Sequence, residues 1–311
     1  MSSFHPSISF RQDSSGKFAD TPSEHPPGTL ARSTRIILLI HGYNNSPDAA
    51  AEAYAAFTQV LGDTGPQLMG VYWPGSNWTN VAYYMASIGN ARESAKRLAQ
   101  VLRLAARGRP RLSLGIIAHS MGCRLTLELA RELRETPEPG LVLEGVVLMA
   151  AAVPMFTLDP SGHLRGLIAA PPGQRLRVHS AYSDNDWVLK FAFRIGQSLA
   201  PGPEGLLPVA LGSRPWRDSG GQYSGAISQA DADGAGHGDY WGKAAKTRHI
   251  AIATAAAAKQ FLNLAQAPPR EIPSRASGER PVLPPRSVAS GRQTPVRDAL
   301  PARRVRGADI G

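Results

Sequence analysis

The sequence predicts an α/β fold, with a mostly parallel central sheet and helices on both of its faces. Short apolar runs of the kind that form buried strands alternate along the chain with longer segments of helical periodicity. Such alternation produces strand–helix–strand units, whose strands lie parallel and whose helices cover the sheet. The chain has 311 residues, 42% of them hydrophobic, which is enough to fill the core of one large domain.

The elements can be placed in order from these patterns. The run RIILLI at 35–40 is almost entirely apolar and predicts the first strand, and the Ala-rich segment 47–61 predicts a helix. The next strand, 67–73, is closed by Pro74 and Gly75. The further strands are predicted at 111–119, 143–153, 175–183 and 225–230, and the further helices at 80–106, 120–135, 186–198 and 248–264.

Three regions are expected along the chain. Residues 1–33 are polar and contain several prolines, which predicts a flexible leader, and residues 34–265 hold the α/β domain. Residues 266–311 contain eight prolines and almost no aliphatic periodicity. Because this segment cannot bury enough apolar surface to offset the entropy lost on ordering, we expect a disordered C-terminal tail.

The tail also carries much of the positive charge. It holds nine Arg against four acidic residues, which is half of the net charge of +10. No aromatic residue is interleaved with these arginines for base stacking. We therefore expect no specific nucleic-acid partner, and at most a weak contact between the tail and an anionic surface.

The cellular compartment is predicted from three features. The single cysteine, Cys123, excludes an intramolecular disulfide and is compatible with a reducing compartment. The N-terminus lacks a basic segment followed by an apolar run, and no stretch approaches 18 apolar residues without charge. These features predict a cytoplasmic protein. Cys123 is expected to be a small packed hydrophobic residue, the alternative being a thiol near the site.

The most informative segment is RLSLGIIAHSMGCRLTLELARELRE at 111–135, where an apolar strand turns into an amphipathic helix at Ser120. A serine hydroxyl is a weak nucleophile at neutral pH, and a tight strand-to-helix turn exposes it beside a base at a helix N-terminus. Such a turn needs small residues two positions before and after the serine, where Ala118 and Gly122 stand. The pattern predicts a nucleophile elbow; the alternative is a serine that only caps the helix.

A nucleophilic serine needs a base, and in this type of sheet the acid and the histidine follow the serine in that order. Beyond the candidate acid loop only His237 and His249 remain. His237 lies in the turn-rich run DADGAGHGDY after the last predicted strand and is the predicted base. His249 opens the final helix, where we expect it to face solvent.

The orienting acid is predicted in the loop YSDNDWVL, which follows the strand 175–183. Either Asp184 or Asp186 could accept a hydrogen bond from the imidazole and stabilise the imidazolium. We favour Asp186, which directly precedes an apolar helix start, and keep Asp184 as the main alternative. Asp159, after the preceding strand, is a third candidate.

The oxyanion that forms during acyl transfer needs two preorganised N–H donors. One is predicted to be the backbone of Met121, directly after the nucleophile. The second is predicted to be the backbone of Tyr43, because the strand 35–40 runs into His41 and Gly42, and glycine permits a close approach of the backbone. His41 itself is expected to brace this loop rather than to act as a second base.

The segments IILLIHGYNNS, VYWPGS, IIAHSMGCRLTLELA, AYSDNDWVL and GHGDYW, in this order, resemble the α/β-hydrolases, specifically the DUF900-type bacterial serine hydrolases. The resemblance covers about residues 35–264, and Ala118 replaces the usual first glycine of the elbow. It implies an α/β-hydrolase fold, Ser120 as nucleophile, His237 as base, Asp186 as acid and the amides of Tyr43 and Met121 as oxyanion donors. It implies no metal and no organic cofactor.

These residues predict a serine hydrolase that cleaves a small acyl ester through an acyl-enzyme. A lipase, thioesterase or acyltransferase on the same triad, or a non-catalytic binding protein of this fold, are the alternatives. Only about 20 residues (154–174) separate two of the predicted strands, so we expect little or no lid. An aromatic-rich set could wall an acyl pocket or form the buried face of the long helix. Its members are Tyr72, Trp73, Trp78, Tyr83, Tyr84 and Met85.

Overall fold

A computed structural model describes residues 4, 6–12, 17–75, 81–171, 173–193, 208–218, 221, 223 and 225–264, with the backbone alone for 81–85 and 192. All of them belong to one unit, Met1–Pro268. The expected tail 266–311 lies outside the described residues.

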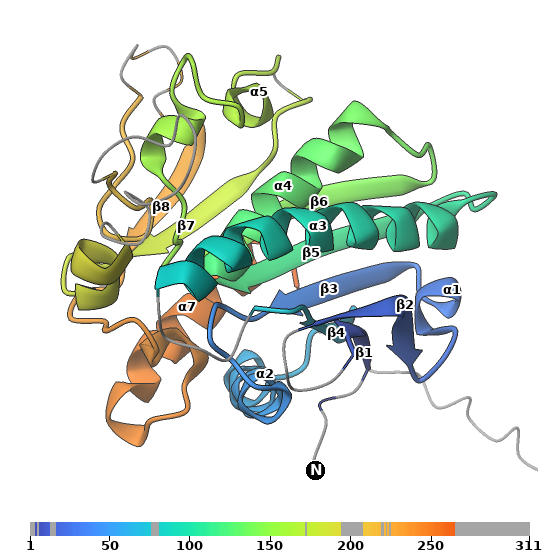
Figure 1. Cartoon of the computed structure of the whole chain (residues 1–311), viewed down its shortest axis with the longest axis horizontal. Helices are drawn as coiled ribbons and strands as arrows, with labels where there is room; N and C mark the ends of the chain where they lie inside the picture. The colour runs from blue at the N-terminus through green and yellow to red at the C-terminus, as the bar shows by residue number, and fades with distance from the viewer. Residues whose placement is uncertain are drawn as a thin grey trace, which may run out of the picture. The chain divides into compact units, whose positions relative to one another are not determined.

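The described chain alternates between strands and helices (Figure 1). The strands are β1 (Ser7–Arg11), β2 (Phe18–His25), β3 (Arg35–Ile40), β4 (Gln67–Tyr72), β5 (Leu112–His119), β6 (Leu141–Met149), β7 (Val178–Tyr182) and β8 (Ile227–Asp231). The α-helices are α1 (Thr29–Arg32), α2 (Pro47–Leu61), α3 (Val81–Ala106), α4 (Met121–Glu135), α5 (Arg165–Ile168) and α7 (Arg248–Phe261). Short turns of other helix types are η1 (Met155–Leu158), η2 (Val188–Ala192), η3 (Asp239–Trp241) and η4 (Ala245–Thr247).

The strands form one eight-stranded sheet in the order β2-β1-β4-β3-β5-β6-β7-β8. Every neighbouring pair is parallel except β1 with β2. The strands β3, β5, β6, β7 and β8 therefore all end at the same edge of the sheet. In open parallel sheets this carboxyl edge is where binding sites form.

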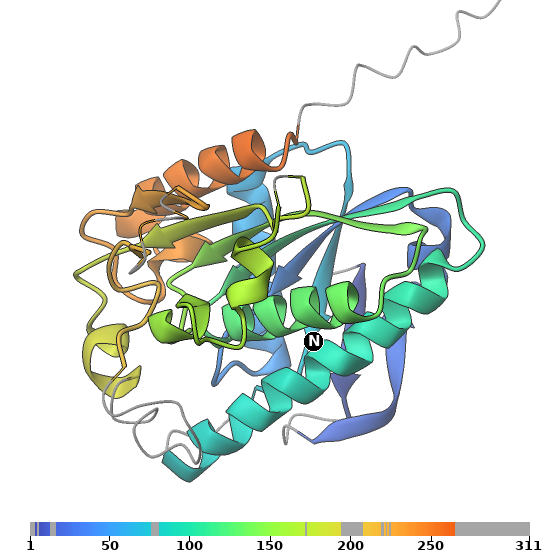
Figure 2. The same cartoon turned by 90° about the horizontal axis from the view of Figure 1, so that it is seen from above.

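Helices cover both faces of the sheet, as Figures 1 and 2 show: α3 and α4 lie on one face, and α2 and α7 on the other. The side chains of β3 alternate between these two layers because successive residues of a strand point to opposite faces. Ile36 and Leu38 join the core under α3 and α4, whereas Ile37 and Leu39 join the core under α2 and α7. The predicted fold class, a mostly parallel sheet with helices on both faces, is confirmed.

The expectation of a flexible leader over residues 1–33 is wrong. The segment contains β1, β2 and α1, and β1 extends the sheet by pairing with β4. Ile8 and Phe10 of β1 are buried in the same core as α3 and α4. The strand has only five residues, so its apolar alternation is lost among the surrounding polar and proline residues, and its partner β4 follows much later in the chain.

Several element boundaries also differ from those predicted. β6 ends at Met149 instead of 153 because Ala150 takes a positive φ of 47° and turns the chain out of the sheet. The helix α7 ends at Phe261, two residues before Asn263 with its φ of 50°. Of the helix expected at 186–198, the structure describes residues 186–193, which include the turn η2, and residues 194–198 lie outside the described part. The segment 154–174 carries η1 and α5.

Within the described part of the chain, none of the helices combines the length and the apolar composition that crossing a bilayer requires.

Candidate active site

Ser120 joins β5 to α4 in a strained turn. Its φ is 53° and its ψ is −122°, a conformation that a residue with a side chain adopts only when its surroundings impose it. Its N–H donates to the carbonyl of Met149 (2.9 Å), and its own carbonyl accepts from the N–H groups of Cys123 (3.0 Å) and Ala152 (3.1 Å). These backbone bonds hold the turn between α4 and the end of β6.

The small residues at this turn are required by close packing. A Cβ on Gly122 would lie 2.8 Å from the carbonyl oxygen of Ile40 and would collide with the carbonyl of His41. Ala118 is fully buried in β5, between Ile40 of β3 and Leu148 of β6. The end of β3 therefore leaves no space for a larger side chain at position 122.

The structure brings Ser120, His237 and Asp186 together in one hydrogen-bonded chain. Ser120 Oγ lies 2.8 Å from His237 Nε2, and His237 Nδ1 lies 2.7 Å from Asp186 Oδ2. Because a carboxylate only accepts, Nδ1 carries the hydrogen and Nε2 is left to accept from the hydroxyl. The side chain of Asp186 has no exposed surface, and that of His237 is 20% exposed.

Asp186 is positioned by the start of η2. Its Oδ1 accepts the N–H of Leu189 (3.0 Å) while its Oδ2 contacts His237, so one carboxylate both caps the turn and orients the imidazole. The other two candidates lie elsewhere: Asp184 is exposed, and Asp159 is half-buried at the end of η1. Of the three aspartates, Asp186 is the one that contacts His237 among the hydrogen bonds of the described residues.

His237 lies in the loop that connects β8 to η3. Glycines flank it on both sides, and the N–H of Gly236 donates to Asp239 Oδ2 at 2.8 Å. His249, the other histidine considered, is exposed at the start of α7 and lines a separate cavity of about 160 Å³ with His179 and Asp231. The structure therefore joins His237, and not His249, to Ser120.

The loop after β3 lies directly against Ser120. A Cβ on Gly42 would stand 2.8 Å from the Cβ of Ser120, so this contact requires glycine. Tyr43 follows Gly42, and Met121 is the first residue of α4, whose early N–H groups have no acceptor within the helix. Both expected oxyanion donors thus belong to segments that meet at Ser120.

Hydrogen bonds fix the shape of this loop. Asn45 Nδ2 donates to the carbonyls of Gly42 (3.3 Å) and Tyr43 (3.0 Å), and Ser46 Oγ accepts the N–H of Ala49 to cap α2. The loop is therefore anchored by its own side chains and by the beginning of the next helix.

His41 stabilises the same loop through hydrogen bonds of its ring and its backbone. Its Nδ1 donates to the carbonyl of Gly42 (2.8 Å), its carbonyl accepts from Trp73 Nε1 (2.8 Å), and its N–H donates to the hydroxyl of Tyr54 (2.9 Å). Burial, together with the nearby charge of Arg11, holds the pKa of His41 well below its usual value, so the ring is neutral. These contacts agree with the bracing role expected for His41.

Arg11 is a supporting residue that the sequence did not reveal. Its Nε donates to the carbonyl of Trp73 (2.7 Å) and its Nη2 to the carbonyl of Asn45 (2.6 Å). The side chain is buried, which lowers its pKa to about 10, and its Nη1 has no partner within the described residues. Nothing in the local sequence signals this role, because Arg11 lies in β1, far along the chain from the loop it supports.

His119 was also missed, although its position directly before Ser120 is a signal. Its Nε2 lies 2.6 Å from the carbonyl oxygen of His237. Cys123, in contrast, is fully buried and its thiol donates to the carbonyl of Ala118 (3.2 Å). Burial raises the pKa of the Cys123 thiol, which keeps it un-ionised and agrees with the expected packing role.

The aromatic set considered as a pocket wall is described only in part. Tyr72 and Trp73 are buried, in the cores on opposite faces of the sheet, and Trp73 stacks on His41 with ring centroids 5.6 Å apart. They are core residues. Trp78 and the side chains of Tyr83, Tyr84 and Met85 lie outside the described part.

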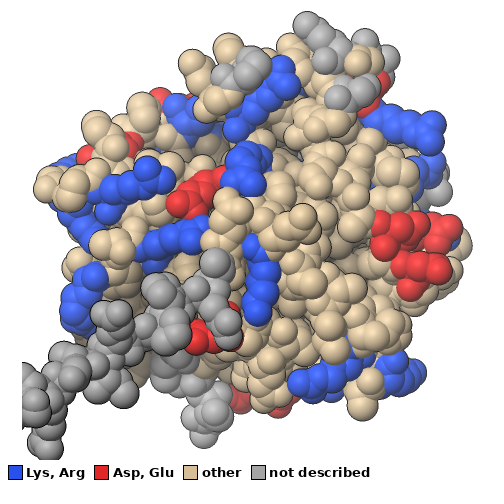
Figure 3. Space-filling model, turned by 180° about the vertical axis from the view of Figure 1, so that it is seen from behind, with Lys and Arg blue, Asp and Glu red and all other residues tan. Residues whose placement is uncertain are grey.

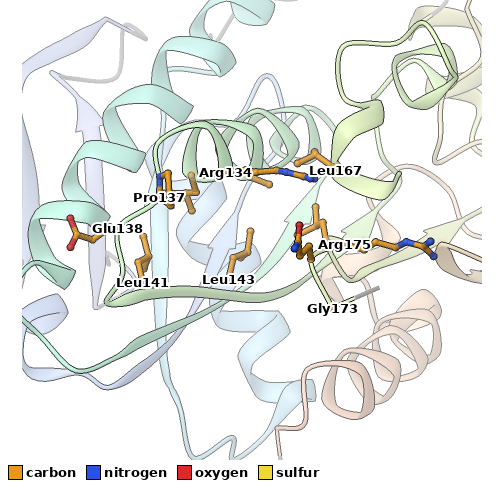
Figure 4. Close-up of a pocket in the computed structure, with 12 residues that line it drawn as sticks. Arg134, Pro137, Glu138, Leu141, Leu143, Leu167, Gly173 and Arg175 are labelled. Atoms are coloured by element: carbon orange, nitrogen blue, oxygen red, sulfur yellow. The ribbon is translucent and has the colours of Figure 1, made fainter. Parts of the chain in front are cut away.

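A cleft of about 210 Å³ is unrelated to this site (Figure 4). It is lined by Leu141 and Leu143 at the beginning of β6, together with Arg134 of α4 and Arg175. Ser120, however, bonds to Met149 at the other end of β6. The cleft therefore lies at the amino edge of the sheet, opposite the edge that carries the candidate site.

No group of three or more His, Cys, Asp or Glu side chains among the described residues could hold a metal ion. On the face shown in Figure 3, the described Lys and Arg side chains are spread between uncharged surface and acidic groups.

Comparison with solved structures finds matches at low sequence identity and low TM-score. A Pyrobaculum calidifontis esterase is 14% identical, with a TM-score of 0.41 and coverage of 76% of this chain and 78% of that chain. The type II thioesterase YbtT, from a yersiniabactin biosynthetic pathway, is 13% identical, with a TM-score of 0.43 and coverage of 76% and 96%. The RedJ thioesterase of Streptomyces coelicolor is 12% identical, with a TM-score of 0.41 and coverage of 74% and 92%.

No curated protein matches the sequence. A family match, in contrast, covers residues 29–199, more than half of the chain. This range includes Ser120 and Asp186 and ends before His237. The chain therefore belongs to the family described as alpha/beta hydrolase of unknown function (DUF900).

Proposed function

We propose that this protein is a serine hydrolase that cleaves an acyl ester through an acyl-enzyme intermediate. The observation that carries the proposal is the continuous hydrogen-bonded chain from Ser120 Oγ through His237 to the buried carboxylate of Asp186. Its geometry matches what activation of a serine requires: a base within hydrogen-bond reach of the nucleophile and a third group that orients the base.

In the proposed reaction, Ser120 Oγ attacks the carbonyl carbon of the ester, and His237 Nε2 takes the hydroxyl proton. The proton then passes from Nε2 to the oxygen of the departing alcohol as the bond between carbonyl carbon and alcohol oxygen breaks. Water next attacks the acyl-enzyme, with His237 again taking a proton, and the acid product leaves as Ser120 regains its hydrogen. Asp186 holds the imidazole in the tautomer that these steps need and stabilises the imidazolium.

The negative oxygen of each tetrahedral intermediate is assigned to the N–H groups of Tyr43 and Met121. Support comes from the close approach of Gly42 to Ser120 and from the position of Met121 at the N-terminus of α4, where the helix dipole favours negative charge. Each such donor contributes about 10²- to 10³-fold in kcat in enzymes of this kind.

A fluorophosphonate probe tests the proposal, because it reacts covalently with an activated serine. We expect labelling of Ser120 in the folded protein and its loss in Ser120→Ala. We also expect His237→Ala to abolish labelling, whereas His249→Ala, a matched change at an exposed histidine of the same region, leaves it unchanged. Wild-type protein that is folded but unlabelled, or labelling that survives His237→Ala, contradicts the proposal.

The substrate class is tested separately with p-nitrophenyl esters of increasing acyl length and with matched thioesters. We expect turnover of short to medium acyl esters, with Ser120→Ala as the blank. Faster turnover of the thioesters at equal acyl length would keep the serine mechanism and replace the ester by a thioester as the substrate.

A further inference from the structure

His119 links the strand of the candidate nucleophile to the loop of the candidate base. It is the last residue of β5, and its Nε2 lies 2.6 Å from the backbone carbonyl oxygen of His237. Because a carbonyl oxygen only accepts, Nε2 must carry the hydrogen of this bond. The side chain next to Ser120 therefore donates to the backbone of His237.

The loop around His237 depends on such a bond. Gly236 and Gly238 flank His237, and glycine leaves a backbone with more conformational freedom than any other residue. Among the described residues, a Cβ at Gly238 would meet no atom within 4 Å, and one at Gly236 would meet the carboxylate of Asp239 alone. Since packing at these glycines is open, the position of His237 depends on hydrogen bonds at Nδ1, at Nε2 and at its carbonyl oxygen, together with the contact of its ring with His119.

The surroundings of His119 keep it neutral and fixed. It is 5% exposed and packs against the rings of His237, Tyr240 and Trp241, at centroid distances of 4.9, 6.3 and 5.8 Å. Burial, and the neighbouring His237, lower the pKa of His119 to about 3. A neutral ring is needed at this place, because the proposed reaction puts a positive charge on His237 next to it.

The orientation of His119 leaves one of its ring nitrogens without a partner among the described residues, which indicates that its other hydrogen bond has a function. With the hydrogen on Nε2, the Nδ1 of His119 is an acceptor, and it is buried without a partner within the described residues. A buried acceptor without a donor destabilises the folded state. An apolar side chain would avoid this cost, but it would leave the carbonyl of His237 without its donor.

We propose that His119 is a positioning residue whose Nε2–H holds the carbonyl of His237 and thereby keeps His237 Nε2 within reach of Ser120 Oγ. This inference rests on the proposed function. A misplacement of about 1 Å in a reacting group can lower the rate by about 10²-fold, so the effect of losing the bond is measurable.

Three substitutions at one position separate the hydrogen bond from the packing. His119→Phe keeps an aromatic ring against Tyr240 and Trp241 and removes the donor. His119→Gln places an amide N–H near the position of Nε2, and His119→Asn carries the same amide one methylene shorter, too short to reach the carbonyl of His237. The matched control is His179→Phe, because His179 is also buried and its Nε2 has no partner among the residues that the structure describes. Its ring packs on Phe261 instead of on the triad.

The readouts are kcat and KM on a p-nitrophenyl ester, the rate of fluorophosphonate labelling, and the melting temperature. We expect His119→Phe and His119→Asn to lower kcat and the labelling rate by about 10- to 100-fold, with KM changed less than about twofold. His119→Gln should recover most of the loss, and His179→Phe should leave kcat unchanged.

The outcomes are distinguishable. If His119→Phe and His119→Asn lower the melting temperature but leave kcat and the labelling rate of the folded protein at the wild-type level, the role is structural and the inference is wrong. The same holds if folded His119→Gln is no faster than His119→Asn. Wild-type protein that is not labelled at Ser120 overturns the proposed function, and the positioning role falls with it.

Discussion

At the scale of single residues, the two carboxylate oxygens of Asp186 make two different hydrogen bonds. Oδ2 contacts His237 Nδ1 at 2.7 Å, and Oδ1 accepts the N–H of Leu189 at 3.0 Å. The carboxylate is thus held rigidly by the start of η2 while it orients the imidazole. An amide at this position could still cap the turn, but it could present an N–H to His237 and favour the wrong tautomer.

We therefore expect Asp186→Asn to lower kcat on a p-nitrophenyl ester by about 10⁴-fold while the protein stays folded. Asp184→Asn is the matched control, since Asp184 is exposed two residues earlier in the same loop, and its kcat should stay within about twofold of wild type. The measurement is steady-state kinetics with circular dichroism to verify folding. Equal losses in both variants, or a larger loss at Asp184, would assign the orienting role differently.

Gly42 gives a second prediction at this scale. A methyl group there would lie 2.8 Å from the Cβ of Ser120 and 3.1 Å from His119 Nδ1, so the loop must move away from Ser120. If Tyr43 donates to the oxyanion, Gly42→Ala should lower kcat by about 10²-fold or more, which is the loss of one oxyanion donor. Gly89→Ala is the control, because a Cβ there meets nothing within 4 Å. A fully active Gly42→Ala variant would show that the loop does not contribute a donor.

At the scale of elements, the loop after β3 depends on a strand that comes much earlier in the sequence. Arg11 of β1 donates hydrogen bonds to the carbonyls of Trp73 and Asn45. The side chain of Asn45 in turn donates to the carbonyls of Gly42 and Tyr43. A buried guanidinium is costly, and among the ion pairs of the described residues none involves Arg11. We infer that this cost is offset by the shape that Arg11 gives to the loop after β3.

Arg11→Met tests this connection. Removing the guanidinium takes one donor from the carbonyl of Asn45 and one from that of Trp73, which still accepts the N–H of Gly75 (2.7 Å). It also removes a buried charge, so we expect the free energy of unfolding to change by less than about 3 kcal/mol. The loss of loop support should appear instead as a fall of about tenfold or more in kcat. Steady-state kinetics measures the change in kcat, and urea denaturation measures the change in the free energy of unfolding. Arg11→Lys retains the charge and one donor nitrogen, so its kcat should lie between those of wild type and Arg11→Met. An Arg11→Met variant with wild-type kcat would mean that β1 only extends the sheet.

At the scale of the whole molecule, buried neutral histidines link stability to pH. The pKa of His41 lies well below 6.5 and that of His119 at about 3, in both cases mainly because of burial. Histidines in the unfolded chain titrate near 6.5, so below this pH the unfolded state binds more protons than the folded state. Acid therefore lowers the free energy of unfolding over the window from about 6.5 down to about 3.

Glu128 further lowers the free energy of unfolding at lower pH. Burial alone would raise its pKa, but the hydrogen bond from His163 and the charges of Arg131 and Arg92 outweigh burial and hold the pKa at about 2, below the ordinary 4.5. Its ionised form thus stabilises the folded state above about pH 4.5, and this contribution disappears as the pH falls towards 2.

We expect urea denaturation to give a nearly constant free energy of unfolding above about pH 7 and a steady decrease below about pH 6. His119→Phe should make the decrease shallower, since it removes one of the titrating groups. Glu128→Gln should alter the slope only below about pH 4.5. A free energy of unfolding that stays unchanged from pH 7 to pH 5 would contradict the burial of neutral histidines.

The pattern of apolar residues was enough to predict the parallel sheet, the helices on both faces and the strained turn at Ser120. These features depend on local periodicity and on the few residue types that a turn accepts, such as Ala118 and Gly122. The three residues proposed as the triad were also named from the sequence, because a sheet of this kind requires their order and leaves few candidates for each place.

The sequence could not show which polar groups form hydrogen bonds with one another, because these groups come from segments far apart in the chain. The sequence favoured Asp186 but left Asp184 as an alternative, because only the folded turn shows which carboxylate contacts His237. Arg11 and His119 show the same limit: one reaches across 34 residues to Asn45, the other across 118 to His237. Packing of the sheet brings these groups to hydrogen-bond distance, and only in the folded structure does a polar group acquire its partner.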